Sequence, residues 1–161
     1  MGETGDCERA RYTALPSWVL TQAAAQAHRL VADGLAAAGA RGHHYRVLSV
    51  LEQYGPASQA TLGRRSGVYL SDLVAALNEL AHQGLVKRAP DPADRRRNTI
   101  TLTPAGQQRL REMDEQMARI QEELLAPLLP SERLEITRLL SKVLHHHASP
   151  SIAPSTAPTA W

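Results

Sequence analysis

The residues whose types and spacing most clearly suggest chemistry are Arg95-Arg96-Arg97, which follow Asp94. They end a segment, residues 89–97, whose Pro and Asp content is typical of a turn. An arginine at the tip of a turn can enter the narrow, electronegative minor groove of DNA. A carboxylate two residues before an arginine can accept hydrogen bonds from its guanidinium and restrict its rotamers. The cluster therefore predicts an anionic partner, although a basic run is also typical of a solvated loop.

The distribution of charge favours the same region. The chain has 161 residues and a formal net charge of only +2, so it is no histone-like polycation. Residues 56–111 nevertheless carry nine Lys or Arg against four Asp or Glu, whereas residues 1–55 are balanced and residues 112–161 are acidic. This excess indicates that the middle third of the chain meets the anionic partner.

Seven histidines and one cysteine are the other residues that could carry chemistry. A designed metal site needs convergent ligands, but His145-His146-His147 lie where the last predicted helix passes into a Pro/Ser/Thr/Ala tail. We expect only adventitious metal binding there. Cys7 has Arg9 and Arg11 nearby, and we expect a loose surface thiol rather than a redox sensor. The sequence thus predicts no metal site and no cofactor.

No residue constellation is typical of an enzyme. The motifs G-x-S-x-G and H-E-x-x-H are absent, as is a phosphate-binding loop. A single Cys excludes a disulfide framework, and the polar N-terminus has no apolar signal core. The longest apolar stretch, residues 18–40, is interrupted by polar and charged residues and cannot span a membrane. We expect a soluble, cytoplasmic protein that is not an enzyme and does not contact a membrane.

The elements that must position the arginines are mainly helical. Apolar residues recur at three- and four-residue steps, which predicts helices over residues 16–38, 43–54, 59–65, 70–83, 103–126 and 132–146. Residues 85–88 and 98–102 are predicted to be the two strands of a hairpin. The hairpin would carry the arginines at its tip.

Two of these helices form a predicted helix-turn-helix. Ser58 can cap the first helix, and Gly67 permits a sharp turn before the second. The second helix is then free to enter a major groove, and the hairpin adds a wing. Ala60 and Leu62 are expected to face inward in the first helix. In the second helix, three- and four-residue steps along one face connect Leu70, Leu73, Leu77 and Leu80.

Residues 15–144 resemble the MarR family of transcriptional regulators, which includes the SlyA-type proteins. The most specific segments are ALNELAHQGLVKRAPDPADRRRNTITLTPAGQQ (76–108) and LLPSERLEITRLLSKVL (128–144). The family's Asp-x-Arg in the wing is present as Asp94-Arg95-Arg96, and Leu102-Thr103 matches the Leu-Thr that opens its next helix. The resemblance implies an obligate homodimer that binds a pseudo-palindromic operator and leaves it when a small molecule binds.

The expected fold class is therefore mainly α with a small β-hairpin wing, a winged helix-turn-helix with dimerisation helices at both ends. The resemblance implies a regulator domain over residues 15–146, in which 43–103 bind DNA and 15–42 and 104–146 dimerise. Residues 1–14 are expected to be flexible, and residues 147–161 form a Pro/Ser/Ala tail expected to be disordered.

Matching the family residue by residue gives the expected DNA contacts. Arg96 corresponds to the wing arginine in the minor groove, and Asp94 to the carboxylate that orients it. The second helix departs from the family because Tyr69, Leu70 and the pair Val74-Ala75 replace polar or basic residues. The predicted DNA-binding residues are Gln59, Arg64, Arg65, Leu70, Ser71, Asp72, Ala75, Asp94, Arg95, Arg96 and Arg97.

The family's ligand crevice lies near its first, second and fifth helices. A small phenolic or antibiotic-like ligand would meet aromatic, polar and soft apolar side chains there. Each candidate is also a candidate for the core or the dimer interface. The residues are Trp18, His43, His44, Tyr45, Met113 and Met117.

One alternative function stays open on the sequence. A helical dimerisation or interaction protein, acting through protein partners without DNA, would explain the long apolar helices at both ends. It would not explain a hairpin tipped with arginines.

Overall fold

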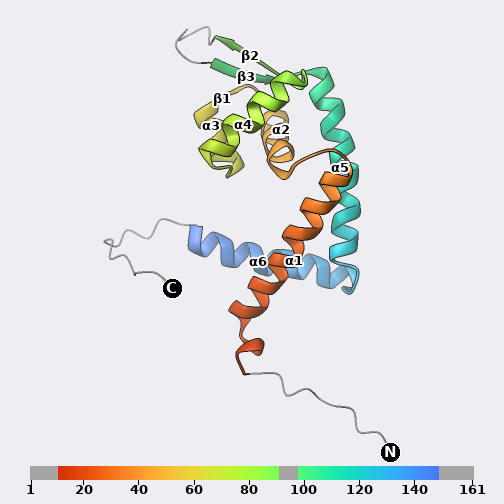
Figure 1. The fold of residues 1–161 in the computed structure, drawn as a ribbon. Coiled ribbons are helices and arrows are strands. Elements are labelled where there is room, and N and C mark those ends of the chain that lie inside the picture. Colours follow the sequence, from red (N-terminus) through yellow and green to blue (C-terminus); the bar gives the residue numbers. More distant parts are fainter. Residues whose placement is uncertain (1–10, 91–97, 149–161) are drawn as a thin grey trace, which may run out of the picture. The chain divides into compact units, whose positions relative to one another are not determined.

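The computed structural model describes residues 11–90 and 98–148. The chain forms two compact units, and the boundary along the chain lies between residues 124 and 125. None of the described helices is long and apolar enough to cross a membrane. The first unit holds most of the elements, and the second holds α6 (Figure 1). In chain order the first unit contains η1 (Arg11–Ala14), α1 (Pro16–Ala37), α2 (Gly42–Tyr54), β1 (Ala57–Ser58), α3 (Gln59–Ser66), α4 (Leu70–His82), β2 (Val86–Pro90), β3 (Asn98–Leu102) and α5 (Pro104–Leu124).

The helix boundaries follow the capping signals of the sequence. Pro16 is the first residue of α1. The hydroxyl of Ser58 accepts a hydrogen bond from the Thr61 N–H at 3.3 Å and so caps α3. Gly67 follows α3 with a φ of +63°, a conformation that L residues other than glycine rarely adopt. Thr103 Oγ1 accepts from the Gly106 N–H at 3.0 Å at the start of α5. The predicted helix-turn-helix is therefore confirmed as α3, the turn at Gly67 and α4.

The sheet is antiparallel with strand order β1-β3-β2. The predicted hairpin is confirmed: β2 and β3 pair with Val86 opposite Leu102 and Pro90 opposite Asn98. Strand β2 begins one residue later than predicted and continues for two more. The third strand, β1, was not predicted, because two residues are too few to show a period of two. Its pairing of Ala57 with Ile100 fixes the start of α3 against the hairpin.

The core of the first unit is built from leucines that lose all or nearly all contact with solvent. They come from α1, α2, α3, α4 and α5, together with Ile100 of β3 and Met113 of α5. One inward-facing prediction is wrong, because Ala60 is exposed. Leu70 is 65% exposed because it begins α4, one turn before the buried Leu73.

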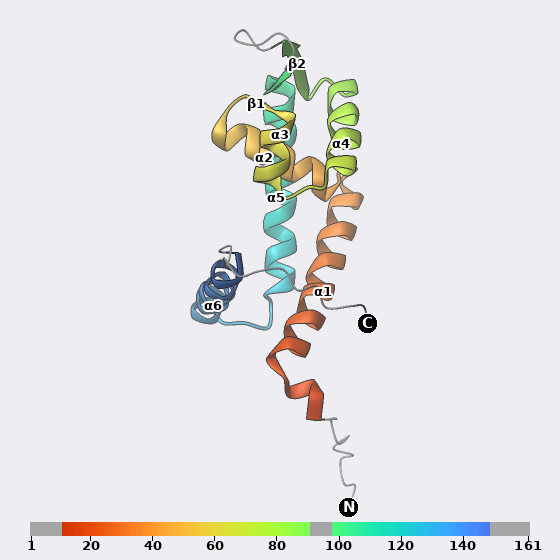
Figure 2. The same ribbon diagram turned by 90° about the vertical axis from the view of Figure 1, so that its left-hand side faces the viewer.

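Helix α5 connects the wing to α1. It starts beside the hairpin, packs on α2 and continues along α1 (Figures 1 and 2). A Cβ on Gly34 of α1 would lie 2.6 Å from Ile120 of α5, so the two helices approach closely there. Arg109 Nη2 donates to the carbonyl of Ala38 at 2.6 Å and satisfies the end of α1.

The N-terminal segment is more ordered than predicted where it is described. Residues 11–14 form η1 rather than loose chain, because the Leu15 N–H donates to the Tyr12 carbonyl at 3.0 Å. Tyr12 also contacts Trp18, with their ring centroids 6.1 Å apart. Cys7 lies outside the described residues.

The second unit contains α6 (Pro130–Ala148). The helix begins two residues earlier than the predicted residue 132, so Ser131 lies inside it. The Leu129 N–H donates to the carboxylate of Glu132 at 2.8 Å, which is one half of a capping box. His145, His146 and His147 continue the helix, and the tail from residue 149 lies outside the described residues.

Candidate nucleic-acid interface

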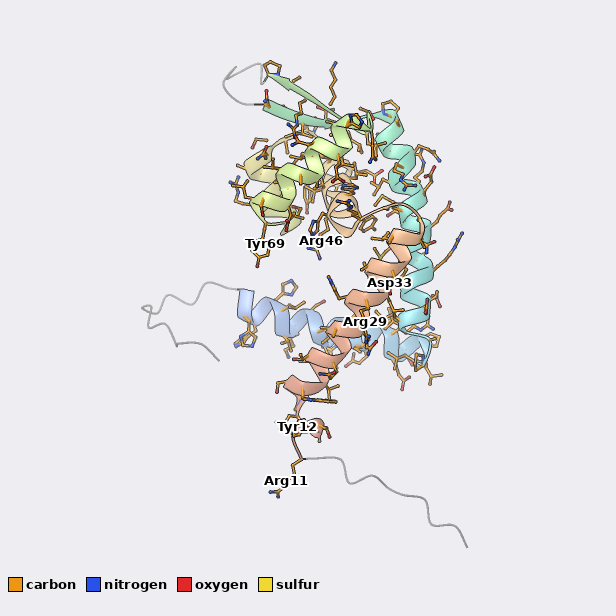
Figure 3. The ribbon with its side chains drawn as sticks, in the orientation of Figure 1. Arg11, Tyr12, Arg29, Asp33, Arg46 and Tyr69 are labelled. Carbon is orange, nitrogen blue, oxygen red and sulfur yellow. The ribbon has the colours of Figure 1, made fainter. Side chains whose placement is uncertain are left out.

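Helix α4 has a buried face and an exposed face that differ sharply in composition. Leu73, Ala76, Leu77 and Leu80 are buried in the core. The opposite face is exposed along α4, and Tyr69 projects outward just before the helix begins (Figure 3). This face is open to solvent. Its members among the predicted DNA-binding residues are Leu70, Ser71 and Ala75, which the structure brings together; Val74 and Asn78 complete it.

Asp72 lies at the edge of that face, where both it and Ala75 line a cavity of about 400 Å³. Asp72 is half-buried on the flank of α4 that faces α1 and α2. The same cavity is lined by Arg41 and Arg46, whose positive charges complement the carboxylate. One residue of sequence turns a helix position by about 100°, so neighbours such as Ser71 and Asp72 occupy different faces. Asp72 therefore belongs geometrically to the cavity.

The predicted contacts on α3 lie at both ends of that helix. Gln59 is half-buried at its start, whereas Arg64 and Arg65 are exposed in its last turn. The Arg65 guanidinium lies 4.5 Å from the ring centroid of Tyr54, a cation–π contact that holds the side chain near α2. Arg64 Nη2 donates to Thr61 Oγ1 at 3.2 Å. Both arginines keep a charge at the surface.

A second cavity, of about 420 Å³, lies between the start of α3 and the base of the hairpin. Its lining includes Gln59 and Arg64 of α3, and Arg88 and Asn98 of the two strands. Arg88 was not among the predicted site residues. Its Nη2 donates to Asn78 Oδ1 of α4 at 2.8 Å, so it joins the wing to the exposed face of α4. The only signal for it in the sequence was the basic pair Lys87-Arg88 at the end of the predicted strand.

The wing tip itself is not described by the structure. Asp94, Arg95, Arg96 and Arg97 lie outside the described residues, and the two strands that lead to them are described up to Pro90 and from Asn98. The assignment of these four residues to DNA binding stays a prediction.

The predicted ligand residues fall into two groups. His43 and His44 line the cavity beside Asp72. The other four lie elsewhere: Tyr45 donates to Asp114 Oδ1 of α5 at 2.9 Å, and Met113 is buried in the core. Met117 packs against that core, and Trp18 contacts Tyr12. Sequence reasoning missed the cavity residues His28, Arg41 and Arg46, because an exposed cation has no helical periodicity that marks it.

A cluster of ionisable side chains joins α2 to α4 next to the same cavity. Arg41 Nη1 donates to Glu79 Oε1 at 3.0 Å, and His44 Nε2 lies 3.1 Å from Glu79 Oε2. The Nε2 atom is buried and has no hydrogen bond of good geometry within the described residues. Burial lowers the pKa of His44 below its ordinary value of 6.5, and the nearby Glu79 carboxylate opposes this effect without cancelling it. His44 is therefore held neutral in the folded protein near pH 7.

No metal site is formed by the described residues. No group of three or more His, Cys, Asp or Glu side chains among them is placed to hold a metal ion. His145, His146 and His147 follow one another on the last turn of α6, and the rings of the last two contact each other edge to face.

Comparison with known proteins finds similarity to transcriptional regulators. A model of the MarR family matches residues 38–97. The HTH-type transcriptional repressor NicR of Pseudomonas putida is 33% identical over 97 residues, which cover 60% of this chain and 61% of that protein. The chain thus spans about 60% of the length of the curated relatives it matches.

Solved structures extend the likeness over most of the chain. A "probable transcriptional regulator" from Pseudomonas aeruginosa has a TM-score of 0.73 and 29% identity, covering 83% of this chain and 99% of that one. The PcaV transcriptional regulator of Streptomyces coelicolor, in complex with its natural ligand, has a TM-score of 0.71 and 26% identity. It covers 84% of this chain and 96% of its own. The relatives are transcriptional regulators and not enzymes, in agreement with the absence of catalytic motifs.

Proposed function

The chain belongs to the MarR family of winged-helix transcriptional regulators, and we propose that it is a homodimeric repressor that binds a pseudo-palindromic DNA operator. The observation that carries the proposal is the exposed face of α4 beside the basic base of the wing. The core holds α4 by Leu73, Leu77 and Leu80, so its opposite face is presented on a rigid element. Arg88 links that face to the hairpin whose tip carries three arginines. This arrangement would place α4 in a major groove and the tip in the adjacent minor groove, in the cytoplasm, where operator DNA is found.

The homodimer is supported by apolar side chains that the described residues leave open to solvent. In the N-terminal part they are Leu15, Val19 and Leu20, each at least 40% exposed. Helix α6 exposes Ile136, Leu139, Leu140 and Val143, which recur at three- and four-residue steps along one face. Such stripes are typical of surfaces covered by a second subunit. A two-fold dimer would place two α4 helices about one DNA turn apart.

Release by a small ligand is the third part of the proposal. The cavity lined by His43, His44 and Asp72 touches α1, α2 and α4, so a ligand bound there could shift α4 relative to α1. A phenolic compound suits the mixture of imidazole, guanidinium and apolar groups. PcaV, a structural neighbour, is a regulator solved with its natural ligand, which supports a ligand-responsive role. Titration of phenolic compounds should weaken operator binding, and loss of that effect in His43→Ala would assign the cavity.

Operator affinity across a salt series tests the DNA-binding proposal. The operator is first located by footprinting the DNA upstream of the protein's own gene. We expect Arg96→Ala to lose about 1–3 kcal/mol of binding free energy and to bind with a shallower salt dependence. Asp94→Ala should lose less, because it frees the arginine instead of deleting it. Arg119→Ala, an exposed arginine on α5, is the matched control and should bind as the parent does.

The alternative, an interaction protein without DNA binding, makes the opposite prediction. It expects no sequence-specific protection of any DNA segment and equal, weak binding by all three variants. A single asymmetric half-site in the footprint would contradict the two-fold dimer while leaving DNA binding in place.

A further inference from the structure

We propose that α4 recognises its operator half-site chiefly through the C5-methyl groups of thymine. The inference rests on the proposed function, because it assumes that α4 enters the major groove. Leu70, Ser71, Val74, Ala75 and Asn78 form what we call the reading face of α4. Ser71, Val74, Ala75 and Asn78 lie on the side of the helix away from the buried Leu77 and Leu80. Leu70 joins them at the open N-terminal end of α4, one turn before the buried Leu73.

The reading face is unusually apolar for a helix that contacts DNA. Leu70 is 65% exposed and Val74 is 38% exposed, and Ala75 is exposed beside them. Tyr69, just before the helix, is 83% exposed and extends the apolar surface. Isolated apolar residues on a surface need no explanation, but a contiguous group on the element that meets the partner does.

The charged side chains of α4 are turned away from this face. Asp72 lines the cavity next to α1 and α2. Glu79 lies within 3.1 Å of both Arg41 and His44 of the neighbouring segment. Neither carboxylate is available to accept a hydrogen bond from a cytosine amino group. The face therefore cannot read G·C pairs through an acidic residue.

The remaining polar side chains of the reading face, Asn78 and Ser71, can make few hydrogen bonds that distinguish one base from another. The Oδ1 atom of Asn78 accepts from Arg88 at 2.8 Å. A bidentate contact to adenine needs both the amide oxygen and the amide nitrogen, and Arg88 competes with the base for that oxygen. Among the described residues of the reading face, Ser71 is the polar side chain that has no hydrogen-bond partner, and a hydroxyl discriminates poorly between bases.

The major groove offers one apolar group to such a surface. The other readable groups there are hydrogen-bond donors and acceptors, and beside small C–H edges the thymine C5-methyl is the one apolar group that projects into the groove. Burying Leu70 or Val74 against unpaired donors and acceptors would cost desolvation without compensation. Packing them against methyl groups removes apolar surface of both partners from water. The chemistry of the face therefore selects half-sites with thymines opposite Leu70, Val74 and Ala75.

Uracil substitution of the operator tests the inference, because uracil keeps the base pair and removes only the methyl group. The full-length protein is titrated with operator duplexes in which half-site thymines are replaced by uracil. Affinity should fall about fourfold for each contacted methyl group, the factor that corresponds to burial of one CH₂-sized group. Duplexes with the same number of uracils outside the half-sites are the control and should bind as the thymine operator does.

A double variant connects the effect to the reading face. Leu70→Ala with Val74→Ala should bind the thymine and uracil operators with affinities that differ by less than twofold. Both positions are exposed, so the thermal melt should match that of the parent and exclude misfolding. Replacing a contacted thymine by 5-methylcytosine should retain more affinity than replacing it by cytosine, since the methyl group is kept.

The outcomes separate this inference from the function it rests on. Specific operator binding that is insensitive to uracil overturns methyl recognition and leaves the DNA-binding proposal standing. Absence of any sequence-specific binding overturns the proposed function itself. In that case, specific retention of another protein that is lost in the double variant would assign the same face to a protein partner.

Discussion

The winged-helix segment and the helices at the two ends of the chain differ in the solvent exposure of their apolar side chains. Between α2 and the start of α5, Leu48, Leu62, Leu77 and Leu110 are at most 1% exposed. In α1 and α6, by contrast, Val19 is 49% exposed and Val143 is 47% exposed. Helical periodicity is similar in both regions, so the pattern alone does not distinguish them. The winged-helix segment therefore completes its core within one chain, and the exposed stripes of the terminal helices are the surfaces that the proposed dimer would cover.

The largest expected effect is on dimer affinity. It follows from placing charge on the exposed apolar side chains of α6, which are Ile136, Leu139, Leu140 and Val143. Leu139→Glu with Val143→Glu would put two unpaired carboxylates from each protomer into the proposed interface, and an uncompensated buried charge costs several kcal/mol. We expect the dimer dissociation constant to rise on the order of a thousandfold or more. Analytical ultracentrifugation over a concentration series measures it.

A matched change on α4 serves as the control. Leu70 is as exposed as the α6 residues, but it lies on the proposed DNA surface. Leu70→Glu should leave the sedimentation coefficient of the dimer unchanged. A folded monomer of about 18 kDa for the parent protein at micromolar concentration would contradict the distinction between the two regions.

The next effect tests the interior of the winged-helix segment. Leu48 is fully buried on α2, and Leu48→Ala removes its transfer free energy and leaves a cavity. The free energy of unfolding should fall by about 2–5 kcal/mol. Denaturant unfolding at fixed protein concentration measures it. Leu70→Ala removes the same atoms from an exposed position and should change stability by no more than about 0.5 kcal/mol.

A smaller effect is expected where α5 begins against the wing. A Cβ on Gly106 would collide with the backbone carbonyl of Leu85, which cannot move away as a flexible side chain could. Gly106→Ala should therefore destabilise the protein by about 1–3 kcal/mol, the usual cost of overpacking. Gly42→Ala is the control because its Cβ would meet nothing within 4 Å. Equal melting temperatures for the two variants would show that α5 can move away from Leu85.

The sequence predicted the elements well because their signals are local. Ser58, Gly67, Thr103 and Pro104 act on their own turns of backbone, and the helices they begin or end were placed within a few residues. The basic wing and the exposed start of α4 could also be predicted, since both follow from the hairpin and the helix-turn-helix. Local signals placed the start of α6 two residues too late. Its first turn is capped by the Glu132 carboxylate, which accepts a hydrogen bond from the Leu129 N–H.

The parts that could not be predicted depend on contacts between elements. The pairing of Arg88 with Asn78 joins residues of β2 and α4, and no spacing in the sequence marks it. The flank on which Asp72 lies is set by how α4 is rotated against α2, which separates it from Ser71. The cations of the cavity come from the segment before α2 and from α2 itself.

The smallest expected effect concerns His44, which is the only buried charged or polar residue of the described core. Burial lowers its pKa in the folded protein, against the partial opposition of Glu79, so folding favours the neutral imidazole. Above the ordinary value of 6.5, both the folded and the unfolded chain carry it neutral, and its contribution does not vary with pH. Below that value the unfolded chain binds a proton that the folded chain does not, so the free energy of unfolding falls as the pH falls until the lowered pKa is passed.

Denaturant unfolding from pH 7.5 to pH 5 should therefore show a steeper decline for the parent than for His44→Gln, in which the titrating group is absent. His43→Gln removes the exposed neighbour on the same turn and should follow the parent curve. If the parent and His44→Gln curves run parallel, the Glu79 carboxylate compensates the burial in full, and α2 and α4 are joined by a contact that is indifferent to pH.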